Sequence, residues 1–293
     1  MTAALRQSYA PGAGTMPGDA SSSRRRVVVL IVGLPSLLPA PAYRIRGRDG
    51  VSCRPQFVWR CSTMSADADY SPAFYARHAQ RYAEVAHNFI QSVYDNVSHP
   101  GLRDDTSLID RMMELVPAGS RGLDAGCGGG ARDVFLYWQK GYDIYGVDAI
   151  EENIAEALRL HPEIAGRVSV TDLREPLGYP DASFDFILCN AVIQHIDPET
   201  ALGVTLPEFA RLLKKGGVLQ LMFKIGRGIA TVYDRHYGED RTFQLYDVDE
   251  VLALLADLGL DVIPEEGVKL GGVIYFTDPK PMEHCVLFAR KVV

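Results

Sequence analysis

From Ser71 onward, apolar and polar positions recur at intervals that predict regular secondary structure. Apolar and aromatic residues three or four apart over residues 74–90 predict an amphipathic helix, with Ser71 available as its cap and Pro72 in its first turn. A second helix is predicted over residues 104–116, and Pro117 ends it. The first part of the patterned chain is therefore expected to be helical.

Beyond Pro117, predicted strands and helices alternate to the end of the chain. Strands are expected near residues 121–124, 143–147, 168–170, 184–189, 218–223, 261–264 and 285–289, and helices near residues 131–140, 151–160, 198–213 and 248–258. This alternation, with a continuously apolar run at residues 186–189, predicts an α/β fold. We expect a doubly wound, mostly parallel seven-stranded sheet with helices on both faces. Its ligand should lie beyond the carboxyl ends of the strands, where the strand order reverses. Residues 226–246 and 267–278 match no element that we can assign.

The first 65 residues have a different composition from the rest. Residues 1–63 contain nine Arg and two Asp, a charge of 9 − 2 = +7, so the other 230 residues of this −7 chain carry −14. A secretory signal is disfavoured because Pro35 and Pro39 interrupt the apolar stretch. An organellar transit peptide and a disordered or spuriously included leader, with Met64 as the working start, both stay open. We predict a leader over residues 1–65, a helical cap over 66–117 and a cofactor-binding domain over 118–293.

Charge and cysteine content narrow the classes of partner. An acidic body repels phosphate backbones, and no basic stripe is evident, so we expect a small-molecule substrate and no nucleic acid. No apolar run reaches the roughly 18–20 residues of a membrane span, so no membrane association is expected. The five cysteines show neither a disulfide pattern nor zinc-ligand spacing, so no metal site is predicted and a reducing compartment is favoured. We expect a cytoplasmic protein, or an organellar one if the leader is a transit peptide.

A glycine-rich loop joins the first predicted strand to the following helix. Asp124 precedes Gly126, Cys127 and Gly128, and a loop of this kind brings backbone N–H groups close to a ligand. Tight turns use the same residues for steric reasons alone, so the loop by itself is weak evidence. Asp148 follows 24 positions after Asp124, at the end of the second predicted strand, where a carboxylate can bind two ribose hydroxyls. Together these features indicate an adenosine-containing cofactor.

The residues around the loop distinguish between two cofactors. Gly126, Gly128 and Ala131 also satisfy the pattern used for dinucleotides, which leaves an NAD(P)-dependent oxidoreductase as an alternative. A carboxylate at Asp124 would repel a pyrophosphate, however, whereas it suits the ammonium and sulfonium groups of S-adenosylmethionine. The segment resembles the first motif of the class I S-adenosylmethionine-dependent methyltransferases, with a type 11/25-like domain.

This resemblance extends in order over roughly residues 70–290 and implies roles for particular residues. It implies that Asp172 and Leu173 meet the adenine ring, that residues 190–196 line the methionine half of the cofactor, and that the helix containing Tyr82 closes over the site. The complete expected cofactor-binding set is Tyr82, Asp124, Gly126, Cys127, Gly128, Asp148, Ala149, Asp172, Leu173, Asn190 and Gln194.

The expected activity is transfer of a methyl group from S-adenosylmethionine to a small molecule. Holding donor and acceptor in line supplies most of the catalysis, and a base is needed only for a hydroxyl or a protonated amine. His195 and His236 are the candidate bases, although a structural role for His195 at the start of the next helix is an alternative. A non-catalytic cofactor-binding or interaction module also stays open. The sequence does not indicate the acceptor, the methylated atom or the oligomeric state.

Overall fold

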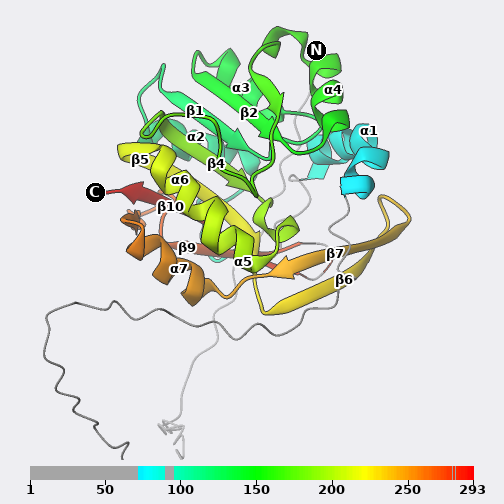
Figure 1. The fold of residues 1–293 in the computed structure, drawn as a ribbon. Helices are drawn as coiled ribbons and strands as arrows, with labels where there is room; N and C mark the ends of the chain where they lie inside the picture. The colour runs from blue at the N-terminus through cyan, green and yellow to red at the C-terminus, as the bar shows by residue number, and fades with distance from the viewer. Residues whose placement is uncertain (1–71, 90–95, 279, 281) are drawn as a thin grey trace, which may run out of the picture. The chain divides into compact units, whose positions relative to one another are not determined.

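A computed structural model describes residues 72–89, 96–278, 280 and 282–293. The predictions for the leader, and for Ser71 as a helix cap, lie outside these residues. Figure 1 shows the strands of a twisted sheet with helices packed against it. Within the described residues, no helix is both long enough and apolar enough to span a bilayer.

The central sheet has eight strands, one more than the sequence predicted. Its first five members are β1 (Arg121–Ala125), β2 (Asp143–Asp148), β3 (Val168–Val170), β4 (Phe184–Asn190) and β5 (Leu213–Lys224). They pair in parallel in the order β3-β2-β1-β4-β5. The order therefore reverses between β1 and β4, which is the position at which such sheets bind ligands.

The other three strands of the sheet join through antiparallel pairing. They are β8 (Leu260–Val262), β9 (Val273–Thr277) and β10 (Glu283–Lys291). Strand β10 lies between β5 and β8 and also pairs with β9. The additional strand β9 falls within residues 267–278, a stretch to which the sequence pattern assigned no element.

Helices cover both faces of the sheet, as the doubly wound prediction requires. Along β4, Phe186 and Leu188 point into one buried cluster, whereas Ile187 and Cys189 point into the other. The first cluster includes residues of α2 (Asp105–Leu115), α3 (Arg132–Gln139) and α4 (Glu151–Leu160). The second includes residues of α6 (Leu206–Leu212) and α7 (Val248–Asp257). The apolar run in β4 is therefore buried from both sides.

The predicted helix over residues 198–213 is divided in the structure. It consists of α5 (Pro198–Thr200), a π-helical turn (Ala201–Thr205) and α6. At the junction, the N–H of Leu206 donates to the carbonyl of Ala201, five residues earlier, and Pro207 follows. Pro207 has no N–H to donate within a regular helix, so a local irregularity is expected there. The remaining short helices are the 3-10 turns η2 (Pro162–Ile164) and η3 (Ile193–His195).

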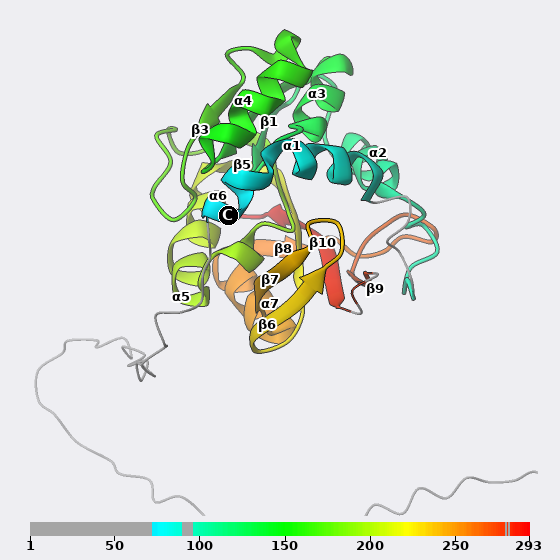
Figure 2. The same ribbon diagram turned by 90° about the vertical axis from the view of Figure 1, so that its right-hand side faces the viewer.

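Two elements outside the layers lie beside the carboxyl ends of the central strands. Helix α1 (Pro72–Phe89) and the antiparallel hairpin of β6 (Gly228–Asp234) and β7 (Glu239–Leu245) are on the same side of the sheet (Figure 2). The hairpin falls within residues 226–246, the other stretch without an assigned element. Arg77 of α1 forms an ion pair with Glu239, and Nε of Arg81 donates to the carbonyl of His236 at 3.2 Å. These contacts join α1 to the hairpin.

Candidate active site

The glycine loop after β1 is fixed by backbone hydrogen bonds to β2. The N–H groups of Gly126 and Cys127 both donate to the carbonyl of Val147, at 2.8 and 2.9 Å. Gly126 and Gly128 have φ angles of +90° and +65°, which favour glycine. A Cβ atom on Gly126 would lie 2.4 Å from a methyl group of Val192, and one on Gly128 would lie 2.9 Å from the Tyr82 ring. The loop is therefore enclosed by the exit of β4 and by α1.

Asp148 is held at the end of β2, directly beside this loop. Its carboxylate accepts hydrogen bonds from the backbone N–H of Gly128 at 3.0 Å and of Ile150 at 2.9 Å. The side-chain amide of Asn153 donates a third bond at 3.0 Å. Burial raises the pKa of Asp148, and these three bonds partly offset the increase. The carboxylate thus has a fixed orientation toward the adjoining cavity.

A cavity of about 230 Å³ opens over the loop at the reversal of strand order. Of the residues that the sequence assigned to cofactor binding or catalysis, eight line it: Tyr82, Gly126, Gly128, Asp148, Ala149, Asp172, Leu173 and His195. Helix α1 and the hairpin also contribute, through Tyr75 and Arg241 among others. The cavity is therefore formed jointly by the sheet and by the two elements beside it.

Asp124 lies beneath the loop and is 5% exposed. Burial raises its pKa well above the ordinary value for an aspartate, and the negative charges of Asp133 and then Asp148 raise it further. Three carboxylates therefore converge near the loop, and a bound cation would relieve their mutual repulsion. Asp124 itself does not line the cavity, so its interaction with a ligand would act through this local charge.

Asp172 reaches the cavity wall from the loop after β3. It forms an ion pair with Arg174, with Nη2 and Oδ2 2.6 Å apart, and both residues line the cavity. The hydrogen bonds from Arg174 lower the pKa of Asp172, against the opposing effect of burial. Asp172 is therefore ionised and oriented, although Arg174 occupies part of its hydrogen-bonding capacity.

Three residues of the expected cofactor set lie outside this cavity. The amide oxygen of Asn190 accepts a hydrogen bond from Gln220 at 2.8 Å, within the sheet. The sulfur of Cys127 packs against β2, because a Cβ on Gly146 would lie 3.0 Å from it. Gln194 is buried in the wall of a second, smaller cavity. Their strand-end positions are as predicted, but their side chains point elsewhere.

His195 lies on η3 between the exit of β4 and α1. Its Nε2 is 2.8 Å from the hydroxyl of Tyr75, and that hydroxyl also accepts a hydrogen bond from Nη2 of Arg241. The hydroxyl proton of Tyr75 is therefore available to the imidazole, which accepts it on Nε2. Burial lowers the pKa of His195 well below its usual range, and the charges of Arg241 and Lys224 lower it further. The imidazole is thus neutral near pH 7.

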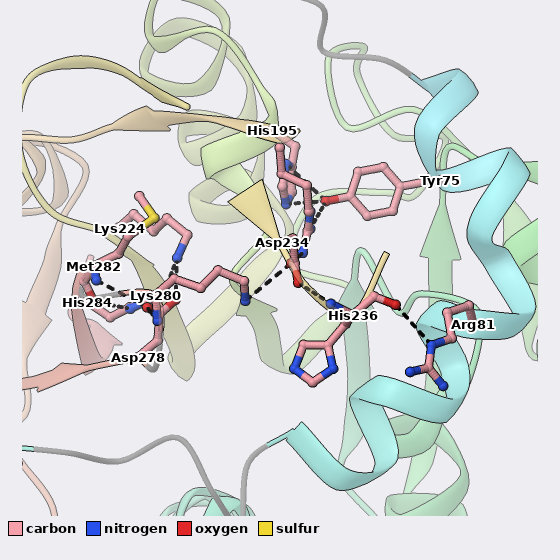
Figure 3. A network of polar contacts seen from close by, with 11 residues as sticks. Tyr75, Arg81, His195, Lys224, Asp234, His236, Asp278, Lys280, Met282 and His284 are labelled. Carbon is pink, nitrogen blue, oxygen red and sulfur yellow. Dashed lines mark hydrogen bonds and ion pairs between the residues drawn. The ribbon is translucent and has the colours of Figure 1, made fainter. Parts of the chain in front are cut away.

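His236 occupies a different environment from His195. It lies in the turn between β6 and β7, where its side chain is exposed, and it lines neither cavity. Its backbone N–H donates to Asp234 at 3.1 Å (Figure 3). Of the two candidate bases, only His195 therefore faces the cavity.

The structure adds two residues that the sequence did not single out. Asn153, in the first turn of α4, supports Asp148. Arg241 of β7 lies within 5.5 Å of the ring centres of Phe74, Tyr75, Tyr237 and Phe243. An Asn five residues after the acid could have suggested the first role. The hairpin shows no sequence pattern that would have suggested the second.

Comparison with known proteins identifies the class of the domain. Residues 123–221 match the family model of a methyltransferase domain. This segment includes the glycine loop, Asp148, Asp172 and the exit of β4. The chain therefore contains a class I S-adenosylmethionine-dependent methyltransferase domain, which confirms the resemblance seen in the sequence.

Individual relatives share part of the chain. Phosphoethanolamine N-methyltransferase 3 of Arabidopsis thaliana is 30% identical over 58% of this chain, which spans 34% of that relative. A ubiquinone biosynthesis O-methyltransferase of Ruegeria sp. is 29% identical over 54% of this chain and 67% of its own length. Among solved structures, a 1,6-didemethyltoxoflavin-N1-methyltransferase from Burkholderia thailandensis is 20% identical. It covers 77% of this chain and 89% of its own, with a TM-score of 0.53, and so shares the fold.

Proposed function

We propose that this protein transfers a methyl group from S-adenosylmethionine to a small-molecule acceptor. The observation that carries the proposal is the rigid Asp148 carboxylate beside the glycine loop, on the wall of the cavity of about 230 Å³. A carboxylate held by three donors can still accept bonds from two ribose hydroxyls, because its two oxygens offer about four lone-pair sites. The matching family supports the same cofactor.

The residues present suit both ends of this cofactor. Asp148 would hold the ribose, and Asp172 and Leu173 would face the adenine ring. The three acids near the loop, Asp124, Asp133 and Asp148, suit the cationic methionine end. When bound, S-adenosylmethionine supplies a methyl group on a positively charged sulfur that is open to nucleophilic attack.

The chain's own contribution to the reaction is chiefly positioning. Tyr82 of α1 packs on the glycine loop and closes the cavity from above, which excludes water from the reacting atoms. The neutral imidazole of His195 can accept a proton from a hydroxyl or amine acceptor. Its lowered pKa makes it a weak base, so acceptors that are already acidic are favoured.

A small molecule is the proposed acceptor for two reasons. Residues 64–293 carry a net charge of −14, which repels a phosphate backbone. The names of the relatives include nitrogen and oxygen methyltransferases, so the methylated atom remains open. A dinucleotide is disfavoured because the acids around the loop would repel its pyrophosphate.

The proposal is tested by calorimetric titration with S-adenosylmethionine and its demethylated product, S-adenosylhomocysteine. Asp148→Asn should weaken both by roughly 10- to 100-fold, because it removes charge-assisted hydrogen bonds worth about 1.5–3 kcal/mol. Asp257→Asn, on the exposed end of α7, makes the same change far from the cavity and should bind as the wild type does. Failure of the wild-type protein to bind either compound would refute the proposal.

A further inference from the structure

A second cavity of about 60 Å³ adjoins the first, and Tyr82, Ala191, His195 and Arg241 line both. We call it the inner chamber. At roughly 15 Å³ for each water-sized group, it has room for about four such groups. It is therefore large enough for the end of a ligand whose remainder lies in the larger cavity.

Two buried cations line the inner chamber. The side chains of Lys224 and Arg241 are 3% and 11% exposed. Lys224 forms an ion pair with Asp278 at 2.9 Å, and Arg241 forms one with Asp234 at 3.1 Å (Figure 3 shows the two acids). Burying these charges is costly, so their arrangement requires a structural or a functional reason.

The acids of these pairs are already occupied by donors from the protein. Oδ1 of Asp278 accepts the backbone N–H groups of Lys280 and Met282, at 2.9 and 3.1 Å, while Oδ2 accepts Lys224. Oδ1 of Asp234 accepts the N–H of His236, and Oδ2 accepts Arg241. Both carboxylates therefore serve to organise the hairpin and the segment before β10.

The cations, in contrast, have donors beyond these bonds. Lys224 has three N–H donors, and among the described residues it contacts Asp278 and the Nε2 of His284, at 2.9 and 2.8 Å. Arg241 has five donors, of which Nη1 bonds Asp234 and Nη2 bonds Tyr75. The chamber wall thus combines saturated acceptors with donors that have remaining capacity.

Two more polar groups in the wall have no partner in the described part of the chain. They are Oε1 of Gln194, a residue that is 4% exposed, and the hydroxyl of Tyr237. A phenol can donate its proton, and half a turn of the Gln194 amide would present its two N–H donors to the chamber. Buried polar groups without partners are uncommon, which indicates that a ligand completes them.

The electrostatic field in the chamber has the sign that these donors imply. His195 lies at the boundary of the two cavities, and after burial the charges of Arg241 and Lys224 are what depress its pKa. Burial, with the charges of Lys280 and Arg241, also lowers the pKa of Lys224 to about 8, although Asp278 opposes this. The positive charge is therefore felt inside the chamber despite the two acids.

We propose that the inner chamber binds the methyl acceptor through a small oxyanion, a carboxylate or an ionised hydroxyl. Tyr237, Lys224, Arg241 and the amide of Gln194 supply the donors, and the ring of Phe243 closes the chamber. The acceptors of this enzyme are then small acids, with the anionic group oriented away from the acidic glycine loop. This inference rests on the proposed methyl transfer and specifies its substrate class.

Acetate and acetamide test the inference, because they have the same shape and differ in charge. Each is titrated against the protein saturated with S-adenosylhomocysteine, and its binding is followed by ligand-observed NMR at constant ionic strength. Acetate should bind at least tenfold more tightly than acetamide. Equal affinities, or no binding of acetate, would overturn the inference. The latter result would also be obtained if the carboxylate of the bound cofactor product filled the chamber.

A charge variant locates the binding. Gln194→Glu places a carboxylate in the chamber at almost unchanged size and should reduce acetate affinity by at least tenfold. Gln139→Glu adds the same charge on the exposed end of α3 and should leave acetate affinity unchanged. Tyr237→Phe is a milder variant that should weaken acetate severalfold. If Gln194→Glu binds acetate as the wild type does, the anion binds elsewhere and the inference is wrong.

The same titrations separate this inference from the proposed function. Binding of S-adenosylhomocysteine is measured first, and its absence would refute the methyltransferase proposal itself. Normal binding of S-adenosylhomocysteine, without a preference for acetate, would refute only the oxyanion chamber.

Discussion

Gly128 combines two constraints that can be separated by mutation. Its φ of +65° is unfavourable for other residues, and an added Cβ would lie 2.9 Å from the Tyr82 ring. Gly119 has a φ of +80°, but a Cβ added there would meet nothing within 4 Å, so it shares only the first constraint. We expect Gly119→Ala to lower the free energy of unfolding by about 1 kcal/mol. Gly128→Ala should lower it further and also weaken S-adenosylhomocysteine binding.

Denaturant unfolding and calorimetry check this comparison. The double variant Gly128→Ala/Tyr82→Ala removes the ring that the new methyl group meets. It should therefore recover the part of the stability loss that exceeds that of Gly119→Ala, after correction for Tyr82→Ala alone. Equal losses in Gly128→Ala and Gly119→Ala would show that the close approach of α1 to the loop has no energetic consequence.

Individual site residues could be predicted where local chain geometry determines their position. Gly126, Gly128 and Asp148 follow strands whose carboxyl ends meet at one edge of the sheet, so their convergence follows from the pattern. The direction of a side chain at the same edge could not be predicted. Gln194 and His195 are adjacent in sequence, yet only His195 reaches the larger cavity. Arg241 depends on a tertiary contact between segments more than 150 residues apart.

At the level of elements, α1 and the β6–β7 hairpin form one cover over the site. Arg241 packs among aromatic rings of both elements, and its Nη2 donates to Tyr75. Arg241→Leu should therefore release α1, and its backbone amides should exchange hydrogen at least tenfold faster. The measurement is hydrogen exchange by mass spectrometry on peptides from residues 72–85.

The matched control for this experiment is Arg227→Leu. Arg227 precedes the same hairpin but is 82% exposed and pairs with Asp247, away from α1. Exchange in α1 should be unaffected by this change. If Arg241→Leu leaves the exchange of α1 at the wild-type rate, the hairpin does not hold the helix in place.

The elements with strong periodicity were predicted well, and those without it were not. The bounds of α4 and β3 agree with the sequence prediction at both ends, because each has clear flanking signals. The hairpin has mostly exposed or half-buried residues on both faces, so it has little of the alternation that marks a strand. Strand β9 is short and is defined by its pairing with β10, which local sequence does not reveal.

For the whole molecule, buried histidines predict how stability depends on pH. His284 accepts from Lys224 and stacks on Phe276, and burial followed by the charge of Lys224 lowers its pKa to about 3. In the unfolded chain its pKa is about 6.5. Between these values the unfolded chain binds a proton that the folded protein does not. The free energy of unfolding therefore falls as the pH decreases below about 6.5.

We expect this contribution to reach about 2 kcal/mol between pH 7.5 and pH 5. The variant His284→Gln keeps an acceptor for Lys224 but cannot titrate, so its stability should decrease less over the same range. Denaturant unfolding of both proteins at the two pH values gives the difference, in which contributions from other groups such as Asp124 largely cancel. A fall in the variant as large as in the wild type would show that His284 is not the responsible group.

The class of fold was the most predictable property of the whole molecule. Strand and helix alternation with continuously apolar strands leaves few arrangements other than a doubly wound sheet, and the structure confirms this prediction. The predicted sheet lacked one strand, because β9 follows no helix. The division into leader, cap and domain remains a prediction.

Strand β10 also has a consequence for how the protein is made. It hydrogen-bonds to β5, β8 and β9, and these three strands precede it in the chain. While translation has proceeded only as far as β9, β5 is therefore an open edge whose backbone groups can pair with another chain. A ribosome that pauses at this point would release an aggregation-prone intermediate, so the final stretch of synthesis is the step at which this enzyme most needs a chaperone.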